Sequence, residues 1–212
     1  MPICSINPNL YSYPKFKETV KFLIDEYKPT DIVETGTFLG EGSTRVFQET
    51  GLNVFTIEAR YENYFYAKEL YKQKENVALF WGYSLLKDDM LIDLMDFKEW
   101  PKHIIKDSSF SEVFYLKELF SHNYLSPLEN LLFKLINNSR KQIVFLDSAG
   151  GVGFLEYQKF IELPQALLKN KILLLDDINH LKHYKSVKNL EENGYAFNKF
   201  ERFGYCSFME NA

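Results

Sequence analysis

The 212-residue sequence has few of the features expected of an extracellular or membrane protein. Its only cysteines are Cys4 and Cys206, too few for a disulfide scaffold and without the spacing of a metal knuckle. No apolar run reaches the ~20 residues that span a bilayer, and the first residues lack the basic start and apolar stretch of a signal peptide. We therefore expect a cytoplasmic protein.

An excess of positive charge is also missing. Lysine and arginine total 25 against 29 acidic residues, which gives a net charge of -4. Because binding to phosphate backbones depends on clustered Lys and Arg, this balance argues against a nucleic-acid partner. Apolar residues are abundant instead, with 46% hydrophobic and 17% aromatic residues. This composition is typical of a folded chain, and the length predicts one domain over residues 1–212.

Short apolar runs alternate with helical stretches after an opening helix at 14–29. The apolar runs are predicted to be strands: 31–35, 53–59, 76–84, 141–148 and 171–177. The stretches between and after them are predicted to be helices: 43–50, 61–74, 85–98, 153–169 and 181–192. Continuously apolar strands separated by helices are typical of a parallel sheet covered on both faces. The predicted fold class is therefore α/β.

The alternation of predicted strands and helices is interrupted in two places. At the C-terminal end, "YAFNKFERF" and "YCSFMEN" flank Gly204 with no helix between them, which predicts an antiparallel hairpin and a total of seven strands. Between Ser84 and Lys141 the connection is longer than a helical crossover needs, with an excess at 100–138. This insert is aromatic and apolar, so we expect helices there. Whether it pads the sheet or caps the ligand site stays open.

Polar residues collect where the predicted strands end. In chain order these residues are Glu34, Glu58, Ser84, Asp147 and the pair Asp176 and Asp177. The carboxyl ends of parallel strands meet at one edge of a sheet, and open α/β folds bind ligands in the crevice there. Buried carboxylates are costly unless they are paired or used. We therefore place the functional site at this edge.

The turn after the first strand, "VETGTFLGEGST", contains Gly36, Gly40 and Gly42. This spacing differs from the GxGxxG fingerprint, which counts against a dinucleotide-binding oxidoreductase. A glycine loop can approach a ligand closely, and the helix that follows would offer free N–H groups near Ser43 to a carboxylate. At the end of the next strand, Glu58 is suited to accept hydrogen bonds from a ribose diol.

Five stretches in this order and spacing, "VETGTFLGEGST", "FTIEA", "WGYS", "FLDS" and "LLLDD", resemble class I S-adenosylmethionine-dependent methyltransferases, particularly small-molecule and sugar O-methyltransferases. The resemblance runs from residue 15 to residue 210 without the insert. It implies a Rossmann-like, mostly parallel sheet in the order 3-2-1-4-5-7-6, with S-adenosylmethionine as cofactor. The implied cofactor-binding residues are Glu34, Gly36, Thr37, Gly40, Ser43, Glu58, Ala59, Gly82, Tyr83, Ser84 and Asp147.

Within that resemblance, the methionine part of the cofactor is expected on the loop from Gly36 to Ser43, the ribose on Glu58 and the adenine near Gly82 to Ser84. The sequence departs from the family pattern at Tyr83, where many relatives carry Asp. Adenine recognition is therefore expected through Ser84 or through main-chain groups. After Asp147, "DSAGGVG" lacks the His that another common pattern places there.

Methyl transfer to a hydroxyl requires in-line positioning and removal of a proton. Asp147, Asp176 and Asp177 are predicted to bind one divalent cation, Mg²⁺, which would lower the pKa of the hydroxyl. The metal-free alternative uses Asp147 or His180 as the base. His183 is expected to pack or to lie on the surface, and "KHYKSVK" at 182–188 is interpreted as a solvated basic face.

The predicted function is O-methylation of a small molecule or sugar. The acceptor group stays open among a sugar hydroxyl, a phenol, a carboxylate and an amine, and so does a homo-oligomeric state. The expected partner is a small-molecule acceptor, without a membrane or nucleic acid. Two alternatives remain, a catalytically inactive binding protein with a methyltransferase-like fold and an NAD-dependent oxidoreductase.

Overall fold

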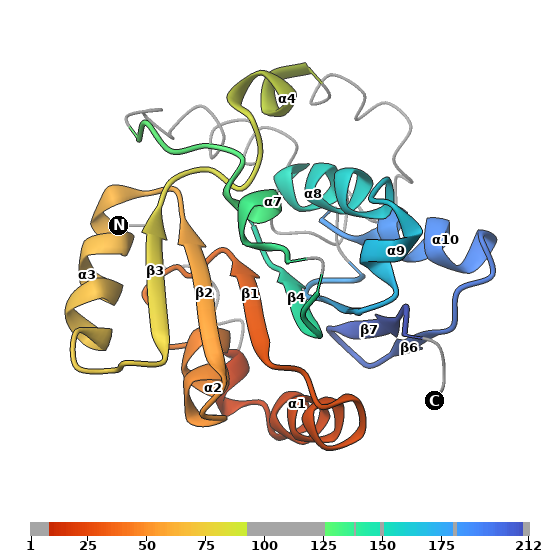
Figure 1. Cartoon of the computed structure of the whole chain (residues 1–212), viewed down its shortest axis with the longest axis horizontal. Helices are drawn as coiled ribbons and strands as arrows, with labels where there is room; N and C mark the ends of the chain where they lie inside the picture. Colours follow the sequence, from red (N-terminus) through yellow and green to blue (C-terminus); the bar gives the residue numbers. More distant parts are fainter. Residues whose placement is uncertain (1–8, 93–125, 138, 149–150, 180–181, 210–212) are drawn as a thin grey trace.

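The computed structural model describes residues 9–92, 126–137, 139–148, 151–179 and 182–209 (Figure 1). The predicted insert at 100–138 lies mostly outside these ranges, and so does His180. The described chain forms one seven-stranded sheet in the order β3-β2-β1-β4-β5-β7-β6. This order and the helices on both faces confirm the predicted fold class.

Five strands of the sheet run parallel. They are β1 (Asp31–Thr35), β2 (Asn53–Glu58), β3 (Val77–Trp81), β4 (Gln142–Leu146) and β5 (Lys171–Leu175). The hairpin of β6 (Phe197–Lys199) and β7 (Gly204–Ser207) joins β5 through an antiparallel pairing of β7, as predicted. The predicted third strand was too long, because β3 ends at Trp81 and Ser84 lies three residues beyond it.

The helices follow the predicted alternation. They are η1 (Leu10–Ser12), α1 (Pro14–Tyr27), α2 (Ser43–Glu49), α3 (Tyr61–Tyr71), α4 (Lys87–Ile92), α7 (Leu131–Leu135), α8 (Gly151–Ile161), α9 (Gln165–Leu168) and α10 (Tyr184–Glu192). None of the helices in the described part of the chain combines the length and the apolar character that crossing a membrane requires.

Two helix predictions were wrong in their bounds. The single helix expected at 153–169 is divided into α8 and α9, because Pro164 has no N–H group to continue a helix and instead precedes α9. The helix expected from residue 181 begins at Tyr184. His183 precedes it with non-helical dihedral angles, so Lys182 and His183 belong to the turn between β5 and α10.

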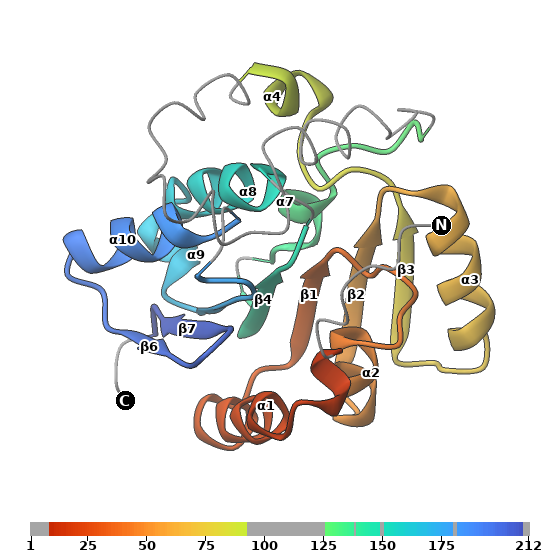
Figure 2. The same ribbon diagram turned by 180° about the vertical axis from the view of Figure 1, so that it is seen from behind.

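Alternate residues of the strands supply two separate cores. Ile32 and Phe145 point to one face of the sheet and pack with α1 and α2. Val33 and Leu146 point to the other face and pack with α7, α8 and α10. Figure 2, seen from behind, shows the same two layers on either side of the sheet. Because both faces are covered, every residue of β1, β4 and β5 is buried.

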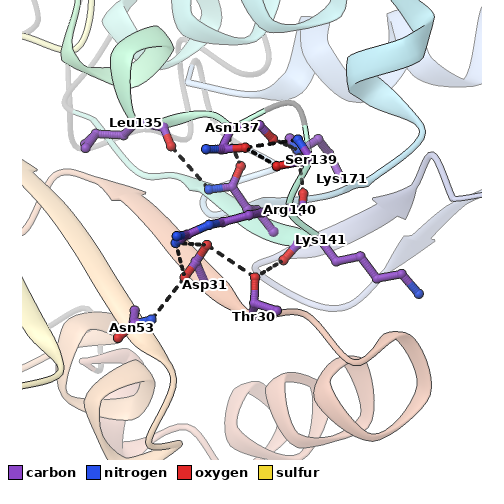
Figure 3. Close-up of polar contacts among 10 residues, drawn as sticks. Thr30, Asp31, Asn53, Leu135, Asn137, Ser139, Arg140, Lys141 and Lys171 are labelled. Atoms are coloured by element: carbon purple, nitrogen blue, oxygen red, sulfur yellow. Dashed lines mark hydrogen bonds and ion pairs between the residues drawn. The ribbon is translucent and has the colours of Figure 1, made fainter.

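The amino-terminal edge of the parallel strands carries buried charged residues that are fully engaged within the fold (Figure 3). Nη1 of Arg140 lies 3.2 and 3.1 Å from the two carboxylate oxygens of Asp31, and Nδ2 of Asn53 donates to the same carboxylate at 3.2 Å. Nζ of Lys171 donates to the carbonyl oxygens of Asn137 and Arg140, at 2.7 and 2.8 Å. These contacts fasten the starts of β1, β2 and β5 to the turn before β4.

Candidate functional site

The glycine loop at 36–42 is docked onto the end of the neighbouring strand β2. The backbone N–H groups of Gly36 and Thr37 both donate to the carbonyl oxygen of Ile57, at 3.0 and 3.2 Å. The hydroxyls of Thr37 and Thr56 are 2.5 Å apart, and the N–H of Phe38 donates to Oε2 of Glu58 at 2.7 Å. The loop and Glu58 therefore form one continuous structure at the carboxyl edge of the sheet.

Gly36 is required by both its conformation and its surroundings. Its φ is +80°, and a Cβ there would lie 2.4 Å from the carbonyl oxygen of Asp147. The loop after β1 thus passes directly against the end of β4, which brings the predicted cofactor loop to the first predicted metal ligand. Gly40, at φ +78°, faces the ring of Tyr71, which lies 2.8 Å from the place a Cβ would take.

Glu34 is fully buried and holds the start of α2. Its carboxylate accepts hydrogen bonds from the hydroxyls of Ser43 and Thr44, both at 2.6 Å. Burial outweighs these hydrogen bonds and raises the pKa of Glu34 to about 7. Because Glu34 and Ser43 bind each other, their side chains fix the shape of the glycine loop. A contact of either side chain with cofactor stays a prediction.

Glu58 is held at the end of β2 by two backbone donors. The N–H groups of Phe38 and Arg60 donate to its two carboxylate oxygens, at 2.7 and 2.8 Å. Burial raises its pKa to about 7 in spite of these bonds, and the residue is 6% exposed. The Asn63 side chain is a third donor to Glu58. A carboxylate has about four acceptor positions, so these bonds orient the group and leave capacity for a further donor. The next residue, Ala59, accepts from Nε1 of Trp81 at 3.3 Å.

The segment from Gly82 to Ser84 is covered by residues 128–132, which return from the insert. The N–H of Tyr83 donates to the carbonyl of Leu128, and the carbonyl of Tyr83 accepts from the N–H of Leu131, both at 3.0 Å. A Cβ on Gly82 would lie 2.7 Å from the Leu128 carbonyl oxygen. The main-chain N–H and carbonyl groups of Tyr83 are therefore paired with the end of the insert. These groups were predicted as one route to adenine recognition.

A buried acid that the sequence analysis missed lies between the strand ends. Glu156 on α8 is fully buried, and its carboxylate accepts from the hydroxyls of Thr35 at 2.9 Å and Ser148 at 2.5 Å. The hydroxyl of Ser84 is a third donor to Glu156. Burial raises the pKa of Glu156 to about 7. The only signal in the sequence is a lone acid within the otherwise apolar stretch "GVGFLEY".

The three aspartates of the predicted metal site do converge. Oxygen atoms of Asp147, Asp176 and Asp177 all lie within 4.8 Å of one another, where β4 and β5 end. Asp176 is fully buried, and the other two are partly exposed. Asp177 adopts a left-handed conformation at φ 53°, which turns the chain directly after β5. Grouping by strand end was therefore sound for these three residues.

Two basic side chains lie among the aspartates. Nζ of Lys182 is 2.6 Å from Oδ1 of Asp147 and 3.0 Å from Oδ2 of Asp177. Arg202 binds Asp176 through Nε at 2.8 Å and Nη2 at 2.5 Å, and its Nε lies 3.2 Å from Oδ1 of Asp177. Each carboxylate of the cluster therefore already pairs with Lys182 or Arg202, and a divalent cation could reach Asp147 and Asp177 only by displacing Lys182.

The electrostatics of the cluster keep Lys182 charged. Burial alone would lower its pKa, but the carboxylates of Asp147 and Asp177 raise it above the ordinary value. Burial likewise acts to raise the pKa of Asp177, and Lys182 and Arg202 together hold it below the ordinary value. The interpretation of 182–188 as a solvated basic face was wrong for Lys182, whose side chain is only 9% exposed.

His183 packs inside the fold, which is one of the two roles, packing or surface exposure, expected for it. Its Nε2 lies 3.1 Å from the carbonyl oxygen of Leu146, and its Nδ1 lies 3.1 Å from the hydroxyl of Ser186. Burial lowers the pKa of His183 to about 3, so the ring is neutral. The neutral ring can donate from Nε2 to Leu146 and accept at Nδ1 from Ser186. His180 and its predicted role as a base lie outside the described residues.

The order of the sheet, the glycine loop after β1 and the acid at the end of β2 define the fold of class I S-adenosylmethionine-dependent methyltransferases. No protein-family model and no curated protein sequence matches the chain. Solved structures do match. A candidate caffeoyl-CoA O-methyltransferase from Staphylococcus aureus aligns with 90% of this chain and 81% of its own, with 14% identity and a TM-score of 0.53.

A second similar structure is the METTL16 MTase domain. It aligns with 99% of this chain and 73% of its own, with 12% identity and a TM-score of 0.51. At such identities the likeness shows a shared fold. The argument for function therefore depends on the site itself.

Proposed function

We propose that the chain is an S-adenosylmethionine-dependent methyltransferase that acts on a small-molecule acceptor, with the cofactor bound at the carboxyl edge of β1, β2 and β4. The observation that carries this proposal is the docking of the glycine loop onto Glu58 through the Phe38 N–H, at 2.7 Å. This contact sets a loop that can approach a ligand closely beside a carboxylate suited to a ribose diol.

The charge of the residues at this edge also supports binding of this cofactor. Glu34, Glu58 and Glu156 are buried carboxylates that accept hydrogen bonds from hydroxyls, backbone N–H groups and, at Glu58, the Asn63 side chain. Such a site favours a ligand with positive charge, because buried carboxylates gain from a nearby cation. S-adenosylmethionine supplies an electrophilic methyl group on a positively charged sulfonium sulfur. Loop 36–42 would hold its methionine part, and Glu58 would hold its ribose.

The chain's own residues then have to bring an acceptor oxygen in line with the methyl group. A bound cofactor would supply the methyl group for an in-line displacement, in which the acceptor oxygen would bond to the methyl carbon as the sulfur–carbon bond breaks and leaves its electron pair on sulfur. The acceptor also loses a proton to a base. Asp147 is partly exposed at this edge and is the described candidate for that base, with a pKa that burial raises to about 6.

Calorimetric titration with S-adenosylmethionine, S-adenosylhomocysteine and NAD tests the cofactor. We expect binding of the first two and none of NAD. Glu58→Ala should weaken S-adenosylmethionine binding by about 1–3 kcal/mol, the cost of losing a charged hydrogen-bond partner. Glu75→Ala is the control, because Glu75 is exposed and lies in the turn before β3. Equal affinities of the Glu58 variant and the wild type would contradict the assignment.

A second experiment separates an enzyme from an inactive binding protein with the same fold. A panel of sugar, phenol, carboxylate and amine acceptors would be assayed for release of S-adenosylhomocysteine. Turnover with an oxygen acceptor supports the proposed O-methyltransferase. Tight cofactor binding without turnover on any acceptor favours a binding protein.

A further inference from the structure

Lys182 lies between two of the three carboxylates of the cluster, and three features around it fix its position. Its Nζ bridges Asp147 and Asp177, which follow different strands. Next to it, His183 is fixed to the carbonyl of Leu146, the last residue of β4, at 3.1 Å. On α8, Gly153 provides the room for its stem, since a Cβ there would lie 2.6 Å from Cγ of Lys182. The side chain is thus held in place by both backbone and packing.

We propose that the Lys182 ammonium is the built-in cation of this cluster, that it replaces a divalent metal ion, and that it binds the acceptor oxygen. This inference rests on the proposed methyltransferase function. It goes beyond that function by naming the acceptor-binding residue and by making the site independent of metal.

The contacts of Lys182 support a role as a hydrogen-bond donor. An ammonium has three N–H donors. Within the described part of the chain, its carboxylate partners Asp147 and Asp177 engage two of them. An acceptor oxygen can take a third. The two carboxylates are themselves partly exposed, at 18% and 21%, so this end of the cluster is reachable from solvent.

The same cation sets the chemical class of the acceptor. A hydroxyl or carboxylate oxygen can accept a hydrogen bond from an ammonium, whereas a protonated amine has no lone pair to offer and is repelled by its charge. The site should therefore prefer oxygen acceptors. Lys182 stays protonated between its carboxylates, so it orients the acceptor and stabilises negative charge that develops on its oxygen.

Entry of a metal ion would require Lys182 to leave. Mg²⁺ needs several oxygen ligands at about 2.1 Å in octahedral geometry, and an ammonium within hydrogen-bond distance of the same oxygens excludes that geometry. Displacing a buried side chain whose neighbour is fixed to β4 adds a further cost. The charge that a metal would balance is already balanced in part by Lys182 and Arg202.

The test is calorimetric titration of the wild-type chain with Mg²⁺ alone and with Mn²⁺ alone. We expect no binding at ~10⁻³ M, the weak end of protein sites for hard cations. Lys182→Met removes the charge, keeps a long apolar stem and leaves three carboxylates with one cation. This variant should gain binding of Mn²⁺, and Mn²⁺ should raise its melting temperature by mass action. Lys188→Ala, a change at an exposed lysine on α10, is the control and should behave as wild type.

Wild-type binding of Mg²⁺ or Mn²⁺ in this range, with loss of turnover on chelation, would overturn the inference whether or not the variant folds. Three results together would support the inference. Turnover of the wild type would withstand exhaustive chelation, kcat of Lys182→Met would fall by about 100-fold, and the affinity of this variant for S-adenosylmethionine would be unchanged. Cofactor affinity is measured on the same samples. Failure of the wild type to bind S-adenosylmethionine would count against the proposed function, whereas metal dependence with normal cofactor binding would count only against the role of Lys182.

Discussion

The two edges of the parallel sheet both bury charged side chains, but they use them differently. At the amino edge, Asp31 has the guanidinium of Arg140, and Lys171 has two carbonyl oxygens (Figure 3). Each charge there is matched by partners that come from the fold. At the carboxyl edge, Glu34 and Glu156 are bound by hydroxyls. Their negative charge is stabilised by hydroxyl dipoles, and among the described residues no cation pairs with it in direct contact.

This difference shows why buried charge alone does not identify a functional site. Asp31 and Lys171 are as fully buried as Glu34, yet their contacts account for them structurally. The carboxyl edge differs because acidic groups from separate strands converge there, next to a loop whose glycines allow close approach. The aspartates of this edge already pair with Lys182 and Arg202, so we expect a cationic ligand beside Glu34 and Glu156. At the amino edge, Asp31 and Lys171 already have their partners from the fold.

The largest expected effect comes from a pair of glycine substitutions. Gly36 follows β1 at the carboxyl edge of the sheet, and Gly51 precedes β2 at the amino edge. Gly36 and Gly51 have nearly the same φ, +80° and +78°, but only Gly36 faces backbone atoms. Gly51→Ala should cost roughly 1–2 kcal/mol of unfolding free energy, the strain of a left-handed residue. Gly36→Ala should cost about 4 kcal/mol and abolish cofactor binding, because its Cβ would overlap the Asp147 carbonyl. Urea denaturation would measure both, and equal costs would mean that the close approach is unimportant.

The amino edge can be broken without touching the proposed site. Asp31→Ala removes a fully buried carboxylate that binds Arg140 and Asn53, and should cost about 2–3 kcal/mol of stability. The affinity of the folded variant for S-adenosylmethionine should equal that of the wild type. Calorimetry below the melting temperature would check this, and a weakened affinity would show that the two edges are not independent.

The carboxyl edge should make stability depend on pH in a definite direction. The pKa values of Glu34 and Glu156 are raised from 4.5 to about 7, so the folded chain keeps these protons to a higher pH than the unfolded chain. Their contribution to stability is full below pH 4.5, is lost as the pH rises toward 7, and is absent above it. Glu34→Gln or Glu156→Gln should each remove part of this decline and stabilise the chain by about 2 kcal/mol at pH 8.

Glu75→Gln serves as the control for that series, because Glu75 is exposed. Thermal or urea unfolding between pH 5 and pH 8 would follow the free energy. A stability that rises with pH over this interval in the wild type, with no effect of either buried substitution, would mean that these carboxylates are stabilised by more than the hydroxyls that bind them.

The smallest expected effect compares two left-handed residues. Lys28 ends α1 and Phe38 lies in the glycine loop, both at φ 52°, and Phe38 is 62% exposed. Glycine at either position relieves backbone strain in the folded chain but raises the conformational entropy of the unfolded chain. The two effects oppose each other, so the unfolding free energy should change by less than about 1 kcal/mol. Only Phe38→Gly should weaken cofactor binding, by about fivefold, because Phe38 donates to Glu58 from a loop that glycine would loosen. Equal affinities of the two variants would remove Phe38 from the site.

The fold was predictable because its signals are local. Each central strand contains apolar residues that are buried on both faces of the sheet. The sheet order followed from motifs that resemble a known family. The errors were at boundaries, where Pro164 ended a helix early and β3 stopped at Trp81. At Pro164 the missing N–H group decided the outcome, and the spacing of apolar residues does not show such a backbone feature.

The candidate site was predictable only in its acids. Glu34, Glu58 and the three aspartates were found because each lies at or just after the carboxyl end of a strand. Their partners were missed, because a partner is chosen by the fold and carries no pattern in the sequence. Lys182 lies 35 residues from Asp147, and Glu156 lies 121 residues from Thr35. Predicting a metal from the acids alone therefore left out the two basic residues that lie among them.

The central claim is that the carboxyl edge, and not the matched amino edge, is the ligand site. A crystal structure of the chain with S-adenosylhomocysteine tests it most directly. The account predicts the methionine part along loop 36–42, the ribose hydroxyls on the carboxylate of Glu58, and Lys182 still between Asp147 and Asp177. A bound ligand that leaves Glu58 without contact, or lies elsewhere on the chain, would contradict the account.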